Sequence, residues 1–232
     1  MSAPELIAPG VYRVDAVGLK NVLNVLLLEN DDGLTLVDTG VAGSLERIKG
    51  AISSLDTGPG DLKRIFLTHQ HGDHTGSLKG LVAWAPGAEV AATAYDAEAI
   101  SGRRKLDKPT GSVMRTLLRN AEPPRVSVVR VVGEGEVVSG FRVIATPGHT
   151  LGHASLLRDS DGLLFTGDTF GSLFATIGVG VRKAFCTDPE LAKRSAEKLL
   201  GEPFTTVVMA HGPVLREDSR AKLQKAVERC RY

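Results

Sequence analysis

The residues of this chain best suited to chemistry are its histidines, and they are grouped. Three lie within FLTHQHGDHTG, two within PGHTLGH and one within MAHG: His69, His71, His74, His149, His153 and His211. Any one of them alone would more often have a structural role. As a set, with carboxylates nearby and no thiolate, they suit zinc first, and also iron, manganese, cobalt or nickel. The set therefore predicts a metal site.

The number of candidate ligands predicts two divalent ions rather than one. A closed structural zinc site has four ligands and favours cysteine, whereas this set is larger and contains none. His69 and His71 are two residues apart, so in extended backbone their side chains share a side and can bind one ion. Gly72 would allow a change of direction, after which Asp73 and His74 could bind a second ion. Open positions on the ions would admit water and substrate.

Apolar, strand-like runs are the elements that must position these side chains. The runs LTLVD, RIFLT, FRVIATPG, LLFTG and TVVMA end at or lead into metal-capable residues, respectively Asp38, His69, His149, Asp168 and His211. Strand ends hold side chains firmly, while the loops that follow stay open to substrate. If the five strand ends lie at one edge of packed sheets, their polar groups converge there.

Strand and helix patterns alternate along the whole chain. Helical patterns cover residues 44–55, 78–85, 96–120 (irregular), 189–200 and 219–230, and a β-rich pattern covers 125–132. Asp188 can cap the helix that begins at Pro189, and Gly201 can end it. The hairpins favour mixed sheets, and the fold class expected is α+β or α/β with helices covering the sheets. No linker divides the sequence, so a single domain over residues 1–232 is expected.

Composition narrows the function classes. The formal net charge is +1, which gives the chain no electrostatic reason to bind nucleic acid or an acidic membrane. The N-terminal residues lack a signal-peptide pattern, and no apolar run approaches the roughly 20 residues of a membrane helix. Cys186 and Cys230 are the only cysteines, and they are expected to be reduced and mostly structural. The expected location is the cytoplasm.

The stretch THQHGDHTG resembles the H-x-H-x-D-H signature of the metallo-β-lactamase fold superfamily. LVDTG upstream, and TPGHTLGH, FTGDT and MAHG downstream, occur in the superfamily's order and approximate spacing. The resemblance therefore extends from about residue 10 to about residue 215. It implies a four-layer αββα sandwich, in which two mixed β-sheets lie face to face with helices outside.

The resemblance also implies roles for individual residues. It implies that His69, His71 and His149 bind a first metal, that Asp73, His74 and His211 bind a second, and that Asp168 bridges both. Asp38 could accept a hydrogen bond from a ligating histidine or simply form the DTG turn, and the two readings have equal weight. His153, four residues after His149, is expected to support the site or pair strands rather than bind metal.

The expected reaction is hydrolysis at a carbonyl carbon. Two ions about 3.5–4 Å apart can share a water and lower its pKa toward 7. The resulting hydroxide would attack an ester, lactone or thioester, while one metal stabilises the oxyanion. Asp73 is the protein group expected to accept or shuttle the proton. The serines occur in no nucleophile-elbow context, so a serine hydrolase is not expected.

Asp168 points to a branch of the superfamily. True zinc β-lactamases usually have Cys or Ser there, so the chain resembles the thioesterase, lactonase and esterase branches. GDTF is similar to the GDTLF of glyoxalase II, although that enzyme has a C-terminal helical domain and only about 20 residues follow His211 here. Lactonases that quench quorum sensing often have a tyrosine shortly after the bridging aspartate, and DTFGSLF has none.

Three alternatives remain open. The first is a mononuclear iron sulfur dioxygenase of the same superfamily, the second a promiscuous β-lactamase-like hydrolase, and the third a metal-binding protein without catalysis. Flavodiiron proteins are disfavoured, because they have Glu where this chain has His71.

Two segments are candidates for contacting substrate. The basic segment 102–125, which includes Arg103 and Arg104, is either a solvated helical face or a lid that attracts an anionic substrate. The apolar loop Phe170–Phe185, which includes Phe174, could line a pocket for an acyl or other apolar group. The partner expected is a small-molecule substrate, with no nucleic acid and no membrane, and a homodimer is left open.

Overall fold

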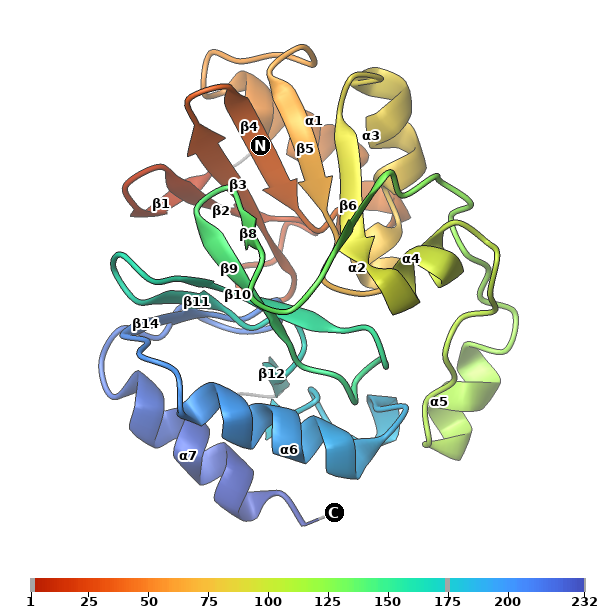
Figure 1. Cartoon of the computed structure of the whole chain (residues 1–232), viewed down its shortest axis with the longest axis vertical. Coiled ribbons are helices and arrows are strands. Elements are labelled where there is room, and N and C mark those ends of the chain that lie inside the picture. Colours follow the sequence, from red (N-terminus) through yellow and green to blue (C-terminus); the bar gives the residue numbers. More distant parts are fainter. Residues whose placement is uncertain (1–2, 174–175, 232) are drawn as a thin grey trace. The chain divides into compact units, whose positions relative to one another are not determined.

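The structure is a computed structural model that describes residues 3–173 and 176–231. The chain forms two compact units, each with its own mixed sheet and its own helices (Figure 1). The first unit comprises Met1–Leu106 and Pro123–Val132, and the second comprises Asp107–Glu122 and Gly133–Tyr232.

The first unit is built on a seven-stranded sheet whose strands follow one another in chain order. They are β1 (Glu5–Ala8), β2 (Val11–Asp15), β3 (Asn24–Asn30), β4 (Gly33–Val37), β5 (Leu62–Phe66), β6 (Glu89–Thr93) and β7 (Arg130–Val132). Strands β1 to β4 pair antiparallel, and β4 to β7 pair parallel. The carboxyl ends of β4, β5 and β6 therefore lie at one edge of this sheet.

The turn between β3 and β4 shows how individual residues determine the connection between two strands of this sheet. Asn30 pairs with Gly33, so Asp31 and Asp32 form a two-residue loop. Gly33 has φ +132°, and a Cβ on it would lie 2.4 Å from the carbonyl oxygen of Asp61. Only glycine fits this turn without a shift of the neighbouring backbone.

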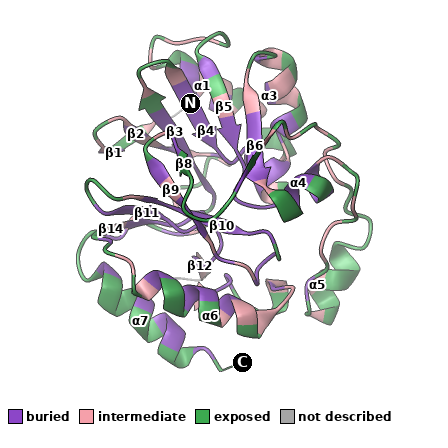
Figure 2. Ribbon diagram, in the orientation of Figure 1, coloured by how far each residue is buried: buried purple, intermediate pink, exposed green. Residues whose placement is uncertain are grey.

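Helices cover one face of the first sheet. They are α1 (Leu45–Ser53), α3 (Leu78–Trp84) and α4 (Ala94–Ile100), with the short elements η1 (Ala42–Ser44) and α2 (Gly72–Thr75) beside them. Alternate strand residues such as Leu34, Leu36 and Ile65 pack against helix residues such as Ile48 and Leu81 in one apolar core. Figure 2 shows the inner strands of this sheet, β2 to β6, as mostly buried.

The second unit has a five-stranded sheet in the order β14, β11, β10, β9, β8. Its strands are β8 (Val137–Val138), β9 (Phe141–Ala145), β10 (Ala154–Arg158), β11 (Leu163–Phe165) and β14 (Thr206–Val208), and a separate hairpin pairs β12 (Phe170–Leu173) with β13 (Thr176–Val179). Strand β10 is antiparallel to both β9 and β11, and β14 is parallel to β11. Consequently β9, β11 and β14 all run in the same direction.

Two long helices cover this second sheet, α6 (Pro189–Leu200) and α7 (Ser219–Arg229). Their buried faces share an apolar core with the sheet, and their other faces are exposed (Figure 2). The predicted cap of α6 is confirmed: the Asp188 carboxylate accepts a 2.9 Å hydrogen bond from the backbone N–H of Leu191, and the helix ends at Gly201. The short helices α5 (Ser112–Leu117) and η2 (Lys183–Phe185) also belong to this unit.

Two expectations about local structure are wrong in extent. The helical pattern over residues 96–120 is interrupted, because α4 ends at Ile100 and α5 covers only Ser112–Leu117. Gly102, with φ +78°, and Pro109 lie between the two helices and disfavour a continuous helix. Of the β-rich segment 125–132, only β7 is a strand. Arg125, at its start, has φ +55°, which strand backbone does not adopt.

Within residues 3–173 and 176–231, no helix is both long and apolar enough to cross a bilayer.

Both cysteines are buried and neither forms a disulfide among the described residues, as expected for structural thiols. Cys186 lies in the core of the second unit, where its thiol approaches the carbonyl oxygens of Gly180 and Arg182 at 3.6 Å. Burial raises the pKa of the Cys186 thiol to about 12, and the negative charge of Asp168 adds to the shift.

We expect Cys186 to resist alkylation at pH 8 in the folded chain, because a pKa of about 12 leaves roughly one thiolate in ten thousand at that pH. The reference pKa is 9.0. The buried thiol therefore contributes stability below about pH 9 that is lost as the pH rises toward 12. Mass spectrometry after iodoacetamide treatment, with and without urea, measures this. Rapid modification of Cys186 without urea would contradict it.

Candidate metal centre

In the first unit, the His-rich stretch follows β5 at the sheet edge where β4 and β5 both end. Asp38 comes directly after β4, and its backbone N–H donates to the carbonyl oxygen of Phe66, the last residue of β5 (2.8 Å). Asp38 has φ +62°, so it also makes the sharp turn of the DTG sequence. A non-glycine residue adopts this backbone only where its surroundings enforce it. The parallel pairing of β4 with β5 thus brings Asp38 beside residues 68–74.

The buried Asp38 carboxylate organises this stretch. It accepts a 2.8 Å hydrogen bond from the Thr68 backbone N–H and another from the Thr68 hydroxyl, and Nδ1 of His74 donates to it at 2.8 Å. Both Asp38 and His74 are fully buried. A carboxylate only accepts, so the proton of His74 is on Nδ1. Nε2 of His74 is therefore the nitrogen that carries the lone pair, and it lies 3.7 Å from an oxygen of Asp73.

Asp38 also orients His69, indirectly through the hydroxyl of Thr68. The Thr68 hydroxyl gives its proton to Asp38, so it accepts a hydrogen bond from Nδ1 of His69 (3.1 Å). Nε2 of His69 then faces Nδ1 of His71 at 3.2 Å. The two histidines thus present their nitrogens to a common point, as their spacing in the sequence predicts.

The glycine that this loop requires is Gly76 rather than Gly72. Gly72 has no positive φ, begins α2, and has open space where a Cβ would be. A Cβ on Gly76 would lie 2.5 Å from backbone atoms of Val41 and Ala42. The chain does change direction at Gly72, as expected, because His71 is extended and α2 begins at Gly72, but no glycine is required there. The loop turns by starting a helix, which brings Asp73 and His74 into its first turn.

In the second unit, three candidate ligands follow strands that run in the same direction. His149 follows β9, Asp168 follows β11 and His211 follows β14, so all three lie at one edge of this sheet. His153 directly precedes β10, which starts at that edge because it runs the opposite way. The topology therefore places all four residues together.

Asp168 lies between two histidines and offers one oxygen to each. Its Oδ2 is 3.2 Å from Nε2 of His149, and its Oδ1 is 3.6 Å from Nε2 of His211. Nδ1 of His149 donates to the carbonyl oxygen of Gly180 (3.2 Å), so its Nε2 carries the lone pair. A lone pair facing a carboxylate oxygen at 3.2 Å is repulsive unless a proton or a cation lies between them.

His153 has both of its ring nitrogens in hydrogen bonds with the protein. The backbone N–H of Asp168 donates to its Nε2 at 2.9 Å, which leaves the proton on Nδ1 for the Thr146 hydroxyl at 2.8 Å. The first of these contacts holds the backbone of Asp168, and the supporting role expected for His153 stays a prediction.

The donors of each unit lie at separations close to those of neighbouring ligands on one metal ion. Two nitrogens bound to a tetrahedral zinc at 2.0–2.1 Å lie roughly 3.3 Å apart. The pairs measured within the units are 3.2 Å for His69 with His71, 3.2 Å for His149 with Asp168, 3.6 Å for His211 with Asp168, and 3.7 Å for His74 with Asp73. Nitrogen and carboxylate donors at these separations fit divalent metal ions.

The two candidate arginines have local partners. Arg103 forms an exposed ion pair with Glu98 at 2.8 Å. Arg104 stacks over the ring of Tyr95 at 3.8 Å, donates to the backbone oxygen of Tyr95, and lies 3.9 Å from the buried Asp96 carboxylate. A contact of either arginine with substrate stays a prediction.

Of the two candidate phenylalanines, Phe170 is fully buried in the core of the second unit. Such a ring supports the fold, and its contact with substrate stays a prediction. Phe174 lies outside the described residues.

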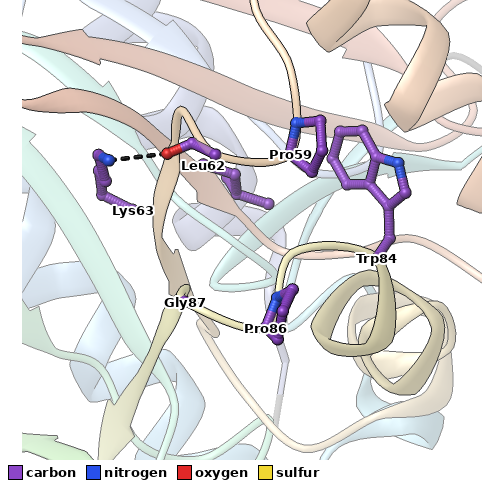
Figure 3. Close-up of a pocket in the computed structure, with 7 residues that line it drawn as sticks. Pro59, Leu62, Lys63, Trp84, Pro86 and Gly87 are labelled. Carbon is purple, nitrogen blue, oxygen red and sulfur yellow. Dashed lines mark hydrogen bonds between the residues drawn. The ribbon is translucent and has the colours of Figure 1, made fainter.

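A small pocket of about 310 Å³ lies at the other end of β5 from His69. It is lined by Pro59, Gly60, Leu62, Lys63, Trp84, Pro86 and Gly87 (Figure 3). Lys63, the charged residue of the lining, donates to the carbonyl oxygen of Gly60 at 2.7 Å. The pocket is separate from the histidines of its unit.

Several residues that hold the candidate ligands were not foreseen from the sequence. Thr68 directly precedes His69 at the end of a strand-like run, and this position is the sequence feature that could have marked it as a supporting residue. Gly180 and Thr146 contact histidines 31 and 7 residues away. Asp96 binds Gln70 from a helix 26 residues further along the chain. Contacts at such separations depend on strand order, which spacing alone does not give.

Comparisons with known proteins agree with this arrangement. A family model described as "Metallo-beta-lactamase superfamily" matches residues 21–211, which include parts of both units. The uncharacterized protein YobT of Bacillus subtilis is 32% identical, over 88% of this chain and 90% of that protein. A hydroxyacylglutathione hydrolase of Pseudomonas putida is 34% identical over 83% of this chain, and the match spans only 61% of that enzyme. One from Methylococcus capsulatus is 31% identical over 88% of this chain and 70% of that enzyme.

Solved structures match the fold over nearly the whole chain. A metallo-beta-lactamase from Cronobacter sakazakii superposes with a TM-score of 0.73 at 24% identity, and covers 99% of this chain and 94% of that one. This likeness confirms the predicted fold class, mixed sheets flanked by helices. The single domain expected over residues 1–232 stays a prediction.

Removing the Thr68 hydroxyl tests the network around Asp38. We expect Thr68→Val to lower the free energy of unfolding of the metal-free chain by about 1–3 kcal/mol, because it removes a donor from a buried carboxylate and an acceptor from His69. Thr68→Ser keeps the hydroxyl and should lose only about 0.8 kcal/mol for the buried methyl. Urea denaturation measures both, and equal losses in the two variants would contradict the hydrogen-bonding role.

Proposed function

The chain belongs to the metallo-β-lactamase superfamily, and from this premise we propose that it is a binuclear metal-dependent hydrolase acting on a thioester, lactone or ester. The observation that carries the proposal is the orientation of three histidines. In His69, His74 and His149 the Nδ1 proton goes to a buried acceptor, and Nε2 faces another metal-capable donor of the same unit. Fixing the ring in this way is how proteins prepare histidines to bind metal.

The ligands in this proposal follow the family pattern. His69, His71 and His149 bind one ion, Asp73, His74 and His211 bind the other, and Asp168 binds both. The proposal is supported by the match of one family model to residues 21–211, which include every one of these positions. Imidazole and carboxylate donors without thiolate favour zinc, with iron, manganese, cobalt or nickel as the other choices.

When bound, such ions lower the pKa of a coordinated water toward 7 and polarise a carbonyl oxygen. Asp73 is the residue we assign to accept the proton of the attacking water. Its side chain is 39% exposed, whereas His74 and Asp168 are buried. A half-exposed carboxylate can pass a proton to solvent. Asp168 is better suited to hold the ligands together, because its two oxygens face two different histidines.

A thioester is the substrate class we place first. Two relatives that are 31% and 34% identical have the name hydroxyacylglutathione hydrolase, and hydroxyacylglutathione is a thioester. The match covers 70% and 61% of those proteins. That this chain hydrolyses a thioester is therefore our proposal, and the acyl group and the thiol of its substrate are left open.

Metal analysis and a substrate panel on one purified sample test the proposal. We expect two divalent metal ions per chain, and hydrolysis of a hydroxyacylglutathione thioester or a lactone in preference to a β-lactam. Asp73→Asn should lower kcat about 10²–10⁴-fold, because it removes the proton acceptor. Asp32→Asn makes the same chemical change in an exposed ion pair with Arg64 and should leave kcat unchanged.

Three results would overturn the proposal. One iron per chain with oxygen consumption would indicate an oxygenase. Hydrolysis that survives in Asp73→Asn and Asp168→Asn would remove the assigned residues from the reaction. Two bound metal ions without turnover of any ester, thioester or lactone would indicate a metal-binding protein.

A further inference from the structure

A buried carboxylate on α4 holds the residue that lies between His69 and His71. Asp96 is 1% exposed and lies in the first turn of α4 beside the apolar residues Ala97, Ala99 and Ile100. Its Oδ2 accepts from the backbone N–H of Gln70 at 2.9 Å, and its Oδ1 accepts from the Gln70 side-chain amide at 2.8 Å. Gln70 is itself fully buried. One carboxylate thus fixes both the backbone and the side chain of Gln70.

The same double contact occurs on the other side of His69. There, Asp38 binds the backbone N–H and the hydroxyl of Thr68. His69 therefore lies between two residues, Thr68 and Gln70, that are each held by a separate buried carboxylate. This segment follows the end of β5 and has neither helix nor strand conformation. Side-chain contacts with Asp38 and Asp96 take the place of regular backbone pairing in holding it.

Arg104 supplies positive charge beside Asp96. A guanidinium nitrogen lies 3.9 Å from Asp96, and the group is kept there by stacking on Tyr95 and by hydrogen bonds to the backbone oxygens of Tyr95 and Lys105. A buried carboxylate is costly without hydrogen bonds and compensating charge. The position of Arg104 meets this need. Its neighbour Arg103 differs, because it pairs with the exposed Glu98.

We propose that Asp96, acting through Gln70, is a positioning residue that sets the His69 and His71 rings in the geometry that binds one metal ion. The inference rests on the proposed function, because it assumes that these two histidines bind metal. It gives Arg104 a role as the counter-charge of Asp96. Neither Asp96 nor Gln70 binds metal or substrate in this proposal.

Zinc affinity of the metal-free chain, measured by competition with a chromogenic chelator, tests the proposal. We expect Gln70→Leu and Asp96→Ala to weaken one of the two zinc equivalents about 10–100-fold and to leave the other within about two-fold. Glu98→Ala is the matched control, because it removes an exposed carboxylate from the same helix and should change neither equivalent. Asp96→Ala is the harsher variant; should it fail to fold, Gln70→Leu decides, because it keeps the backbone N–H that Asp96 binds.

A reversed pair gives a test of rescue. Gln70→Glu alone places a second carboxylate against Asp96 and should weaken the same zinc equivalent. Combined with Asp96→Asn, it restores both hydrogen bonds, because the introduced amide can accept from the backbone N–H of residue 70 with its oxygen and donate to the introduced carboxylate with its NH2 group, so that only the side-chain bond is reversed. We expect the double variant to recover most of the lost affinity.

Unfolding by urea, measured on the same variants, separates positioning from stability. Variants that are less stable but bind both zinc ions as tightly as the wild type would overturn the positioning role and leave the proposed function intact. Equal weakening of both equivalents would overturn it too, as would failure of the double variant to recover. A wild-type chain that binds no metal would instead overturn the proposed function, and this inference with it.

Discussion

The candidate site depends on one constraint, which is that a buried histidine that binds metal through Nε2 keeps its proton on Nδ1 and needs a hydrogen-bond acceptor for it. This chain meets the constraint with three different acceptors. His74 uses the carboxylate of Asp38, His69 uses the hydroxyl of Thr68, and His149 uses the carbonyl oxygen of Gly180. Each acceptor also fixes the rotation of its ring, so the tautomer and the direction of Nε2 are set by the same contact.

Strand direction brings Asp38 and Thr68 together in the first unit and gathers the candidate ligands of the second. In the first unit, β4 and β5 are parallel neighbours, so the residue after β4 and the residues after β5 meet at the same edge. In the second unit, three strands of the same direction end at a common edge, and β10 starts there. A reversal of one strand would move its polar residue to the other end of the sheet. The hydrophobic pattern that specifies each sheet therefore also specifies where its polar residues gather.

Much of this arrangement could be predicted from the sequence, because the strand-like runs and the residues that end them are local. The pairing of His69 with His71 and the cap at Asp188 needed only spacing. Other features needed the fold. Thr68 and Gln70 are ordinary polar residues in the sequence, and their role appears only when Asp38 and Asp96 are brought beside them. The change of direction at Gly72 follows from the motif, whereas the close approach of Gly76 to the backbone of Val41 and Ala42 appears only in the fold.

The basic segment 102–125 shows why charge alone is a weak guide to function. Its arginines and lysines belong to both units, with Arg103 and Arg104 in the first and Arg115 and Arg119 in the second. Arg104 is drawn inward by a buried carboxylate, whereas Arg103, one residue earlier, is satisfied by Glu98 at the surface. Two adjacent arginines thus differ in the carboxylate beside them, which is exposed for Arg103 and buried for Arg104. A cation near a candidate site can therefore offset the charge of a buried protein carboxylate, as Arg104 does beside Asp96, without contacting substrate.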